Sequence, residues 1–211
     1  MGQVKIIGDP GSCHMGKKEI ALELIRAGAI CGLDAIKFQI FKNLPPNIEL
    51  PYKWIEGLVK YGEGLGVEVF ASVWDEDGMS KLRQAGAKSV KFAYSQRNSP
   101  LIETALELFD NVYISGDVFT EFPKRAERLY CVPEYPVPYI PNFEDLFPNR
   151  FDGFSDHTLG NESALLAVKQ GAVVIEKHFT LDRKDIDCPD HRFAIKPKQL
   201  GQMVEKIRRG S

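Results

Sequence analysis

Two histidines close the last two apolar runs of the chain, and both could bind a metal ion. His157 directly follows the run 152–156, and His178 lies near the end of the run 173–179. If these runs are neighbouring parallel strands, the two imidazoles share one edge and can reach a divalent cation at about 2.0–2.2 Å. The residues therefore predict metal ligands at His157 and His178, with ordinary hydrogen-bonded histidines as the alternative.

Two lysines interrupt runs that are otherwise apolar. Lys37 lies in IKFQI and Lys91 in VKFA. A buried ammonium group is costly unless it meets an anion, so both lysines are predicted to bind a phosphate or carboxylate of a substrate. Two alternatives remain open, which are internal ion pairs with Asp9 or Glu176 and a Schiff-base lysine of the kind used by barrel aldolases.

Three further residues are candidates for catalysis. Asp9 ends the first run before a Pro-Gly pair, where its carboxylate could act as a general base, orient a water bound to the metal, or cap the turn. Glu176 shares a strand face with His178 and could hold an imidazole or pair with a lysine. His14, shortly after the first run, is predicted to act with them.

Polar residues also lie at the ends of other runs. They are predicted to bind substrate: Gln39, Ser72, Ser115 and Ser155. In barrels of parallel strands, reactive groups project from the carboxyl ends of the strands. All of these side chains should therefore meet at one rim.

The elements that must position these residues are eight short runs that alternate with helical patterns. This alternation is typical of βαβ units around a parallel sheet. The predicted strands are 4–9, 35–40, 67–73, 89–93, 111–116, 128–132, 152–156 and 173–179, and helices are predicted at 17–30, 161–169 and 198–209. The proline-rich segment 133–148 cannot be a helix interior. We predict a single α/β domain over 1–211, a short (β/α)8 TIM barrel with minimal loops, against an open doubly wound sheet as the alternative.

Composition limits the partners and the compartment. The 27 basic and 29 acidic side chains nearly cancel, which argues against nucleic acid and an anionic membrane surface as partners. The four cysteines show no CxxC spacing, and no long apolar run or leader is present, so a cytoplasmic location is expected. Cys13 is interpreted as a small buried filler.

Several segments match a known family. They are GFSDHTLGNESALLAVKQGAVVIEKHFTLDR at 153–183, CPDH at 188–191, IIGDPGSCHMG near the start and GLDAIKFQIFK after it. With these motifs the chain resembles the N-acetylneuraminate (sialic acid) synthase family over nearly its whole length. The resemblance implies a metal-assisted condensation of phosphoenolpyruvate with an N-acetylated sugar aldehyde, such as N-acetylmannosamine, to give a nonulosonic acid and phosphate.

The resemblance also implies roles for single residues. It makes His157 and His178 ligands of a divalent metal, usually manganese, with magnesium or cobalt as alternatives. Lys37, Lys91 and Ser155 match groups that hold phosphoenolpyruvate. The remaining matches are Ser115 at another pocket position, Gln39 in the motif of the second strand, and Asp190 near the sugar.

The chain departs from the family pattern near the predicted phosphoenolpyruvate site. Asp9 replaces a glutamate and Cys13 an asparagine, while Val73, Tyr94 and Pro133 replace a threonine, a serine and an asparagine. Each lost hydrogen bond to a charged ligand costs about 1.5–3 kcal/mol. Two alternatives therefore remain, which are another metal-dependent aldolase or lyase acting on a small phosphorylated or carboxylated substrate, and a catalytically degenerate barrel that binds a sugar acid. The family's antifreeze-like C-terminal domain is absent from 1–211, and a homodimer is left open.

Overall fold

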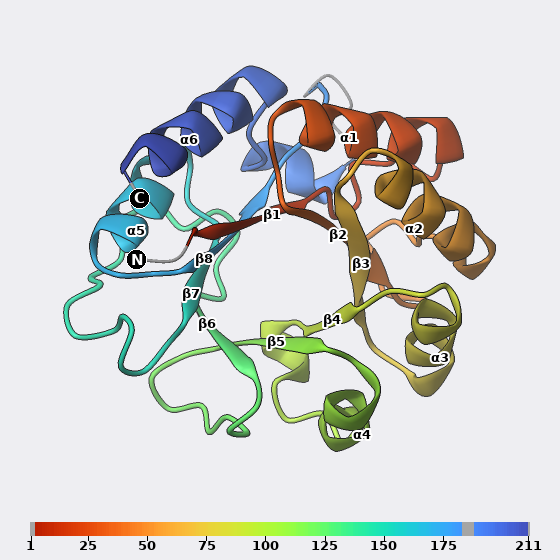
Figure 1. Ribbon diagram of the computed structural model, residues 1–211, viewed down its shortest axis with the longest axis horizontal. Coiled ribbons are helices and arrows are strands. Elements are labelled where there is room, and N and C mark those ends of the chain that lie inside the picture. The colour runs from red at the N-terminus through yellow and green to blue at the C-terminus, as the bar shows by residue number, and fades with distance from the viewer. Residues whose placement is uncertain (1–2, 183–187, 211) are drawn as a thin grey trace.

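The strands close into one barrel. The computed structural model describes residues 3–182 and 188–210, and in these its eight parallel strands form a closed barrel in sequence order (Figure 1). The strands are β1 (Lys5–Asp9), β2 (Ala35–Ile40), β3 (Glu68–Val73), β4 (Ser89–Phe92), β5 (Asn111–Gly116), β6 (Glu127–Cys131), β7 (Gly153–Asp156) and β8 (Val174–His178). The predicted TIM barrel is confirmed, and pairing of β8 with β1 excludes an open sheet. No predicted strand end differs from the observed one by more than one residue.

Helices surround most of the barrel. They are α1 (Lys18–Ile30), α2 (Ile55–Gly64), α3 (Glu76–Gln84), α4 (Leu101–Leu108), α5 (Glu162–Lys169) and α6 (Pro197–Gly210), with short 3-10 turns η1 (Tyr52–Trp54), η2 (Tyr94–Gln96) and η3 (Pro189–Arg192). Within the described residues, no α-helix follows β5 or β6, and long loops take their place in Figure 1. The proline-rich segment therefore forms no helix, as predicted. The missing helices make the chain short for a TIM barrel, at 211 residues.

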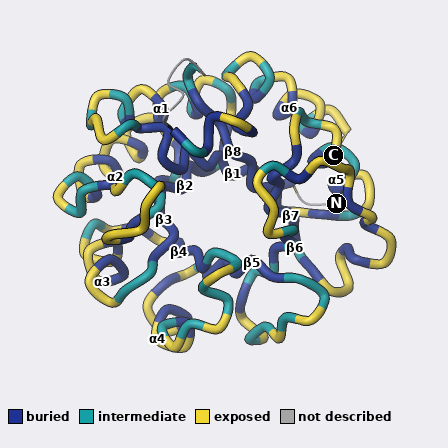
Figure 2. The backbone as a smooth tube through the Cα atoms, turned by 180° about the vertical axis from the view of Figure 1, so that it is seen from behind, coloured by how far each residue is buried: buried dark blue, intermediate teal, exposed yellow. Residues whose placement is uncertain are grey.

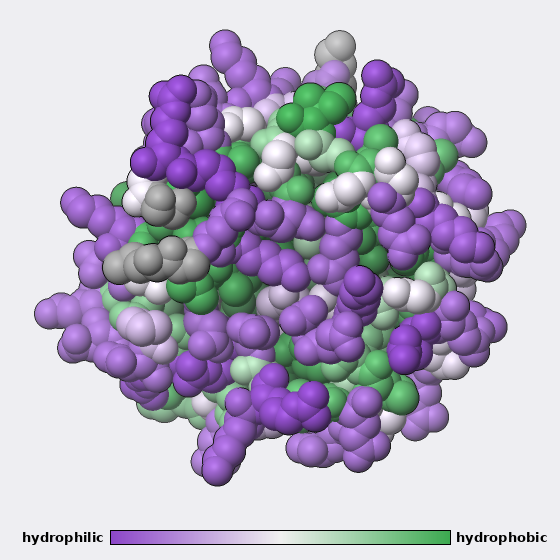
Figure 3. Space-filling model, in the orientation of Figure 1, coloured by the Kyte–Doolittle hydropathy of each residue, from purple (hydrophilic) through white to green (hydrophobic). Residues whose placement is uncertain are grey.

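The strands are buried on both faces. In β2 every residue except Gln39 is buried, because one face points into the barrel and the other packs against helices. Figure 2 shows buried strands at the centre and exposed outer turns of the helices. Hydrophilic residues dominate the face seen in Figure 3, with apolar residues in patches between them. None of the helices in the described part of the chain is both long and apolar enough to cross a bilayer.

One fully buried ion pair lies outside the barrel interior. Lys177 of β8 donates to Asp156 of β7 over 2.9 Å, and neither side chain has exposed surface. The Lys177 ammonium also donates to the carbonyl of Thr158 over 2.6 Å. Strand alternation places Lys177 on the face opposite to Glu176 and His178. This pair therefore joins the two strands that carry the predicted metal ligands.

Loss of that buried cation should be costly. We expect Lys177→Met to lower the free energy of unfolding by about 3–5 kcal/mol, because it leaves the Asp156 carboxylate buried without its counter-charge. Equilibrium unfolding in denaturant measures the effect. The matched control is Lys60→Met, which removes an exposed pair with Glu56 and should leave stability unchanged within error. Equal effects of the two substitutions would contradict the prediction.

Candidate active site

The predicted site residues meet in one cavity at the carboxyl ends of the strands. Its volume is about 630 Å³. Of the twelve residues predicted to act, eleven line it: Asp9, Lys37, Gln39, Ser72, Lys91, Ser115, Ser155, His157, Glu176, His178 and Asp190. Parallel strands of a closed barrel end at a common rim, so residues far apart in sequence converge there. His14 is the exception.

Two lysines and two carboxylates form a buried cluster on the cavity floor. The Lys37 ammonium lies 2.7 Å from Asp9 Oδ2 and 3.2 Å from Glu176 Oε1. The Lys91 ammonium lies 3.1 and 3.3 Å from the two Glu176 oxygens. All four side chains are at most 4% exposed. The cluster is electrically balanced, and the internal ion pairs considered for the lysines are present.

Two serine hydroxyls complete the surroundings of Glu176 and Lys91. Ser115 Oγ accepts from Lys91 over 2.7 Å, and Ser155 Oγ donates to Glu176 Oε1 over 2.7 Å. Glu176 thus binds both lysines and a serine, so of the two roles considered for it, pairing with a lysine is the one present. The strand register brings Ser155 to it, because Ser155 pairs directly with Glu176 across β7 and β8.

The two lysines differ in how firmly they hold their protons. Burial favours the neutral amine in both. For Lys37, Asp9 and Glu176 outweigh burial and raise the pKa. For Lys91, burial prevails over its one carboxylate partner and the pKa is lowered. Burial also opposes ionisation of Glu176, but Lys37 and Lys91 hold the pKa of this carboxyl below its ordinary range.

The two predicted metal ligands lie side by side. The ring centres of His157 and His178 are 5.6 Å apart. His157 Nδ1 lies 3.1 Å from the carbonyl oxygen of Val132, so it carries the proton and Nε2 keeps its lone pair. Burial, followed by the neighbouring His178, lowers the pKa of His157 to about 3, and the ring is therefore neutral.

His178 presents an unsatisfied ring nitrogen. Its Nε2 lies 3.1 Å from Asp9 Oδ2, whereas its buried Nδ1 has no hydrogen-bond partner among the described residues. Asp190 Oδ1 lies 3.9 Å from Nδ1. Ring centres that share one ion lie about 5–6 Å apart when each metal–nitrogen bond is about 2.1 Å. The separation, the neutral His157 ring and the unpartnered nitrogen fit a divalent metal, with Asp190 as the carboxylate beside Nδ1 and Asp9 holding the opposite nitrogen of the His178 ring.

Asp9 makes a contact within its own turn and also lines the cavity. Its Oδ1 accepts from the backbone N–H of Gly11 over 2.8 Å, as the turn-cap alternative predicts. Its Oδ2 faces Lys37 and His178. Burial opposes ionisation, but His178 and Lys37 outweigh it and lower the pKa of Asp9. Asp9 is therefore a carboxylate that accepts hydrogen bonds and is a weak base.

Ser72 and Gln39, two other residues predicted to bind substrate, differ in whether they have a hydrogen-bond partner. Ser72 Oγ is buried at the cavity wall and has no hydrogen-bond partner within the described part of the chain. A ligand would satisfy it. Gln39 Nε2 lies 3.5 Å from Asp9 Oδ2 and is only half-buried, so its amide remains accessible to a ligand.

His14 does not reach the cavity. Its Nδ1 accepts from the N–H of Gly16 over 3.1 Å, and its ring lies 6.4 Å from that of Phe38. Burial lowers the pKa of His14 to about 4. The geometry gives this neutral ring a role in shaping the loop after β1 and does not support the predicted catalytic role.

Several lining residues were not singled out from the sequence. The Tyr135 ring lies 4.2 Å from that of His157, and the Phe193 ring lies 4.8 Å from that of His178. Trp74 and Arg192 also line the cavity. Trp74 directly follows β3, so the strand-end rule could have found it. Tyr135, Arg192 and Phe193 lie in loops whose path the sequence does not specify.

Besides Asp9, two family departures lie beside the cavity. Tyr94 and Pro133 line it, while Val73 does not. The Tyr94 hydroxyl donates to Asp117, and so it is already engaged. Neither side chain therefore offers the free hydrogen-bond donor that the family residue would supply.

The closed (β/α)8 barrel, with paired lysines, carboxylates and neighbouring imidazoles at one rim, has the architecture of TIM-barrel enzymes. The family model described as "NeuB family" matches residues 120–211. The spore coat polysaccharide biosynthesis protein SpsE of Bacillus subtilis is 32% identical over 98% of this chain and 67% of its own length. The chain belongs to the NeuB family.

Further relatives support a synthase-like enzyme. An N,N'-diacetyllegionaminic acid synthase of Campylobacter jejuni is 27% identical over 99% of this chain and 76% of its own length. The crystal structure of N-acetylneuraminic acid (sialic acid) synthetase from Leptospira borgpetersenii in complex with citrate is similar with a TM-score of 0.84 and 27% identity, over 99% of this chain and 84% of that one. The alignment with SpsE spans 251 positions, although this chain has 211 residues, so the relative carries insertions.

Proposed function

We propose that this chain condenses phosphoenolpyruvate with an N-acetylated sugar aldehyde to give a nonulosonic acid and phosphate. The observation that carries the proposal is the arrangement of Lys37 and Lys91 on the floor of the cavity whose rim holds His157 and His178. The names of the synthase relatives agree with this chemistry.

The lysines are the proposed site for the anionic donor. Asp9 and Glu176 balance them, so the cluster has no excess positive charge. A phosphoenolpyruvate anion would share their N–H donors and would need further cations. Arg192 lines the same cavity and supplies one, and the unpartnered Ser72 hydroxyl offers a donor. Such charge-assisted hydrogen bonds are worth about 1.5–3 kcal/mol each.

The acceptor sugar is proposed to bind beside the imidazoles of His157 and His178. His157 and His178, with Asp9 or Asp190 as neighbours, would hold the divalent metal, for which Mn²⁺ is the first choice. When bound, the metal would polarise the aldehyde oxygen as a Lewis acid. Tyr135 and Phe193 pack against the two rings and limit the access of water to them. Asp190, on the sugar side, would orient a hydroxyl group.

The reaction needs one new C–C bond and one hydrolytic step. C3 of phosphoenolpyruvate bonds to the aldehyde carbon, water adds at C2, and phosphate leaves with the electrons of the C2–O bond. Asp9 would orient the water, since its lowered pKa makes it a hydrogen-bond acceptor more than a base. One water proton passes to the former aldehyde oxygen, which becomes a hydroxyl group, and the other passes to the departing phosphate or to solvent.

A second candidate function rests on the hydrogen-bond donors that the family pattern provides and this pocket lacks. Because Tyr94 is bonded to Asp117 and Pro133 has no N–H to offer, the pocket holds fewer hydrogen-bond donors for phosphoenolpyruvate than the family pattern provides. This favours a metal-dependent aldol or lyase reaction on a small carboxylated substrate. Such an enzyme would bind the metal without releasing phosphate from phosphoenolpyruvate.

The test is a phosphate-release assay with phosphoenolpyruvate, Mn²⁺ and a panel of N-acetylated hexose aldehydes. We expect release that depends on one acceptor and is lowered at least about 10²-fold in Lys37→Met, which removes an ammonium group that the donor anion needs. Lys42→Met is the matched control, because this exposed lysine pairs with Asp77 outside the cavity and should leave turnover unchanged. Absence of release with every acceptor would overturn the proposal in favour of the second candidate.

A further inference from the structure

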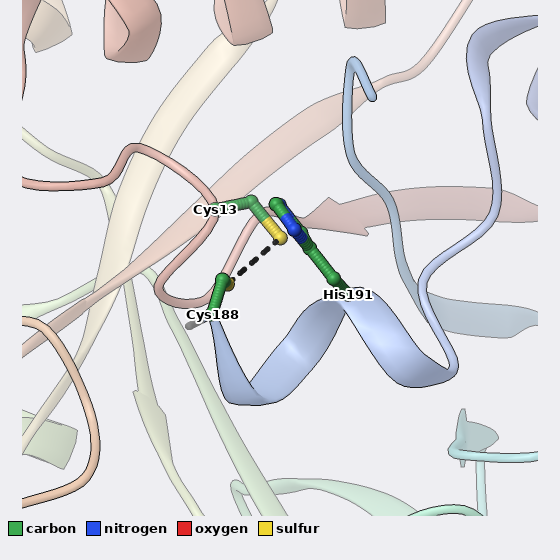
Figure 4. A group of neighbouring side chains, drawn as sticks. All are labelled: Cys13, Cys188 and His191. Atoms are coloured by element: carbon green, nitrogen blue, oxygen red, sulfur yellow. Dashed lines mark hydrogen bonds between the residues drawn. The ribbon is translucent and has the colours of Figure 1, made fainter. Parts of the chain in front are cut away.

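Two cysteines and a histidine form a second buried cluster behind the cavity wall. Cys13 lies in the loop between β1 and α1, while Cys188 and His191 lie at the 3-10 turn η3 that follows β8 (Figure 4). The three residues are 3%, 1% and 6% exposed. Residues 175 positions apart in sequence thus bring two thiols together, so Cys13 is more than an isolated filler.

The spacing of the sulfur atoms is that of a shared metal ion. Cys13 Sγ and Cys188 Sγ lie 3.7 Å apart, and these atoms and a His191 ring nitrogen all lie within 4.8 Å of one another. Two thiolates on one tetrahedral zinc ion, with bonds of about 2.3 Å, are about 3.8 Å apart. A disulfide would need about 2.05 Å. The cluster therefore has the separation of two ligands of one ion and needs little rearrangement to bind it.

This cluster is distinct from the candidate active site. None of its three residues lines the cavity, whereas Asp190, between Cys188 and His191 in the same turn, does. Asp190 Oδ2 accepts from the N–H of Ser12 over 2.6 Å, which ties the turn to the loop that carries Cys13. Gly11 has a φ of +51°, and a Cβ there would lie 2.3 Å from Asp190 Oδ2, so the loop must approach this carboxylate closely.

We propose that Cys13, Cys188 and His191 form a structural site for a thiophilic divalent metal, zinc first, that fastens the β1–α1 loop to the turn after β8. The two thiols release their protons to solvent as the ion binds, and the fourth tetrahedral position is filled from outside the triad. Thiolate ligands select Zn²⁺ over Mn²⁺, so this site prefers zinc whichever divalent metal the imidazole pair at the cavity holds. The inference does not depend on the proposed function.

The test is metal analysis of the full chain, purified under reducing conditions from zinc-supplemented cells. We expect about one zinc per chain in the wild type, in Cys31→Ser and in the double variant His157→Ala/His178→Ala. Cys13→Ser and Cys188→Ser should each weaken zinc binding at least about 10²-fold. Zinc in excess should raise the melting temperature of the wild type but not of the two cysteine variants, because a ligand that binds only the folded state stabilises it.

Cobalt gives a readout that does not require the variants to fold. Co²⁺ added to the zinc-free wild-type protein should produce thiolate-to-cobalt charge-transfer absorption and the intense visible bands of a tetrahedral site. Cys31, which is half-buried and donates to the carbonyl of Pro197, should not contribute to these bands. The proposal is overturned if the thiolate bands are absent, if zinc content is equal in wild type and both cysteine variants, or if the purified chain holds a Cys13–Cys188 disulfide without metal.

Discussion

Glu176→Gln is expected to lower the free energy of unfolding by about 3–5 kcal/mol, because it removes one of two carboxylates from a buried cluster that holds two lysines. The substitution keeps the shape of the side chain. Among the described residues it leaves Lys91 with Ser115 as its hydrogen-bond acceptor and with no anionic partner, since Glu176 is the carboxylate that pairs with it there. Equilibrium unfolding in urea at neutral pH measures the loss, and the slope of the transition should not change.

A double variant tests whether charge balance is the cause. Lys91→Met in the Glu176→Gln background removes the uncompensated ammonium group and leaves the Lys37–Asp9 pair, which spans 2.7 Å, as the remaining ion pair of the cluster. We expect the double variant to regain at least about 2 kcal/mol, which is the size of coupling seen between residues in direct contact. If the costs of the two single substitutions simply add, charge balance does not explain the cluster.

The pH dependence follows from Lys91. Burial lowers its pKa below the ordinary value of 10.5, so between the lowered and the ordinary value the unfolded chain binds a proton that the folded chain lacks. Stability rises with pH wherever the unfolded state binds more protons. Loss of the Glu176 charge lowers the pKa of Lys91 further, because that carboxylate opposes the effect of burial. The cost of Glu176→Gln should therefore shrink as pH rises toward 10.5, and a cost that grows with pH would contradict this account.

The barrel and most of its rim could be predicted because both follow from local pattern. Eight runs with nearly continuous apolar residues specify strands that are covered on two faces, and parallel closure then puts every strand end at one rim. Lys37 and Lys91 were recognisable because an ammonium group inside an apolar strand needs a partner. The same rule could not identify that partner. Glu176 pairs with lysines on β2 and β4 through the barrel interior, and the pattern of a single strand does not show such contacts.

Loop residues set the limit of prediction from sequence. His14 lies five positions after Asp9 and belongs to a matching motif, but the loop turns its ring away from the cavity toward Phe38. Tyr135 reaches His157 from a proline-rich loop that has no periodic pattern. The meeting of Cys13 with Cys188 depends on how two loops dock, and spacing of 175 residues carries no signal for it.

Replacement of either rim histidine should abolish metal-dependent turnover. We expect His157→Ala and His178→Ala each to lower kcat for phosphate release at least about 10³-fold, which corresponds to about 4 kcal/mol of transition-state stabilisation, the size expected when a Lewis acid is lost. Mn²⁺ titration followed by electron paramagnetic resonance should show loss of stoichiometric binding in both variants. His14→Gln removes the histidine that shapes the loop after β1 outside the cavity, and it should keep its manganese.

The two readouts separate the metal assignment from the chemistry. His178 contributes a buried Nδ1 that has no partner in the described part of the chain, and His157 contributes the nitrogen opposite its bond to Val132, so each ring offers one lone pair. With a single imidazole left, an Mn²⁺ ion would keep mainly water and carboxylate ligands and would bind weakly. Unchanged manganese in both variants would refute the ligand assignment whatever the activity. Loss of manganese in both variants, together with a wild-type protein that binds manganese but releases no phosphate with any acceptor, would keep the metal site and favour the aldolase or lyase alternative.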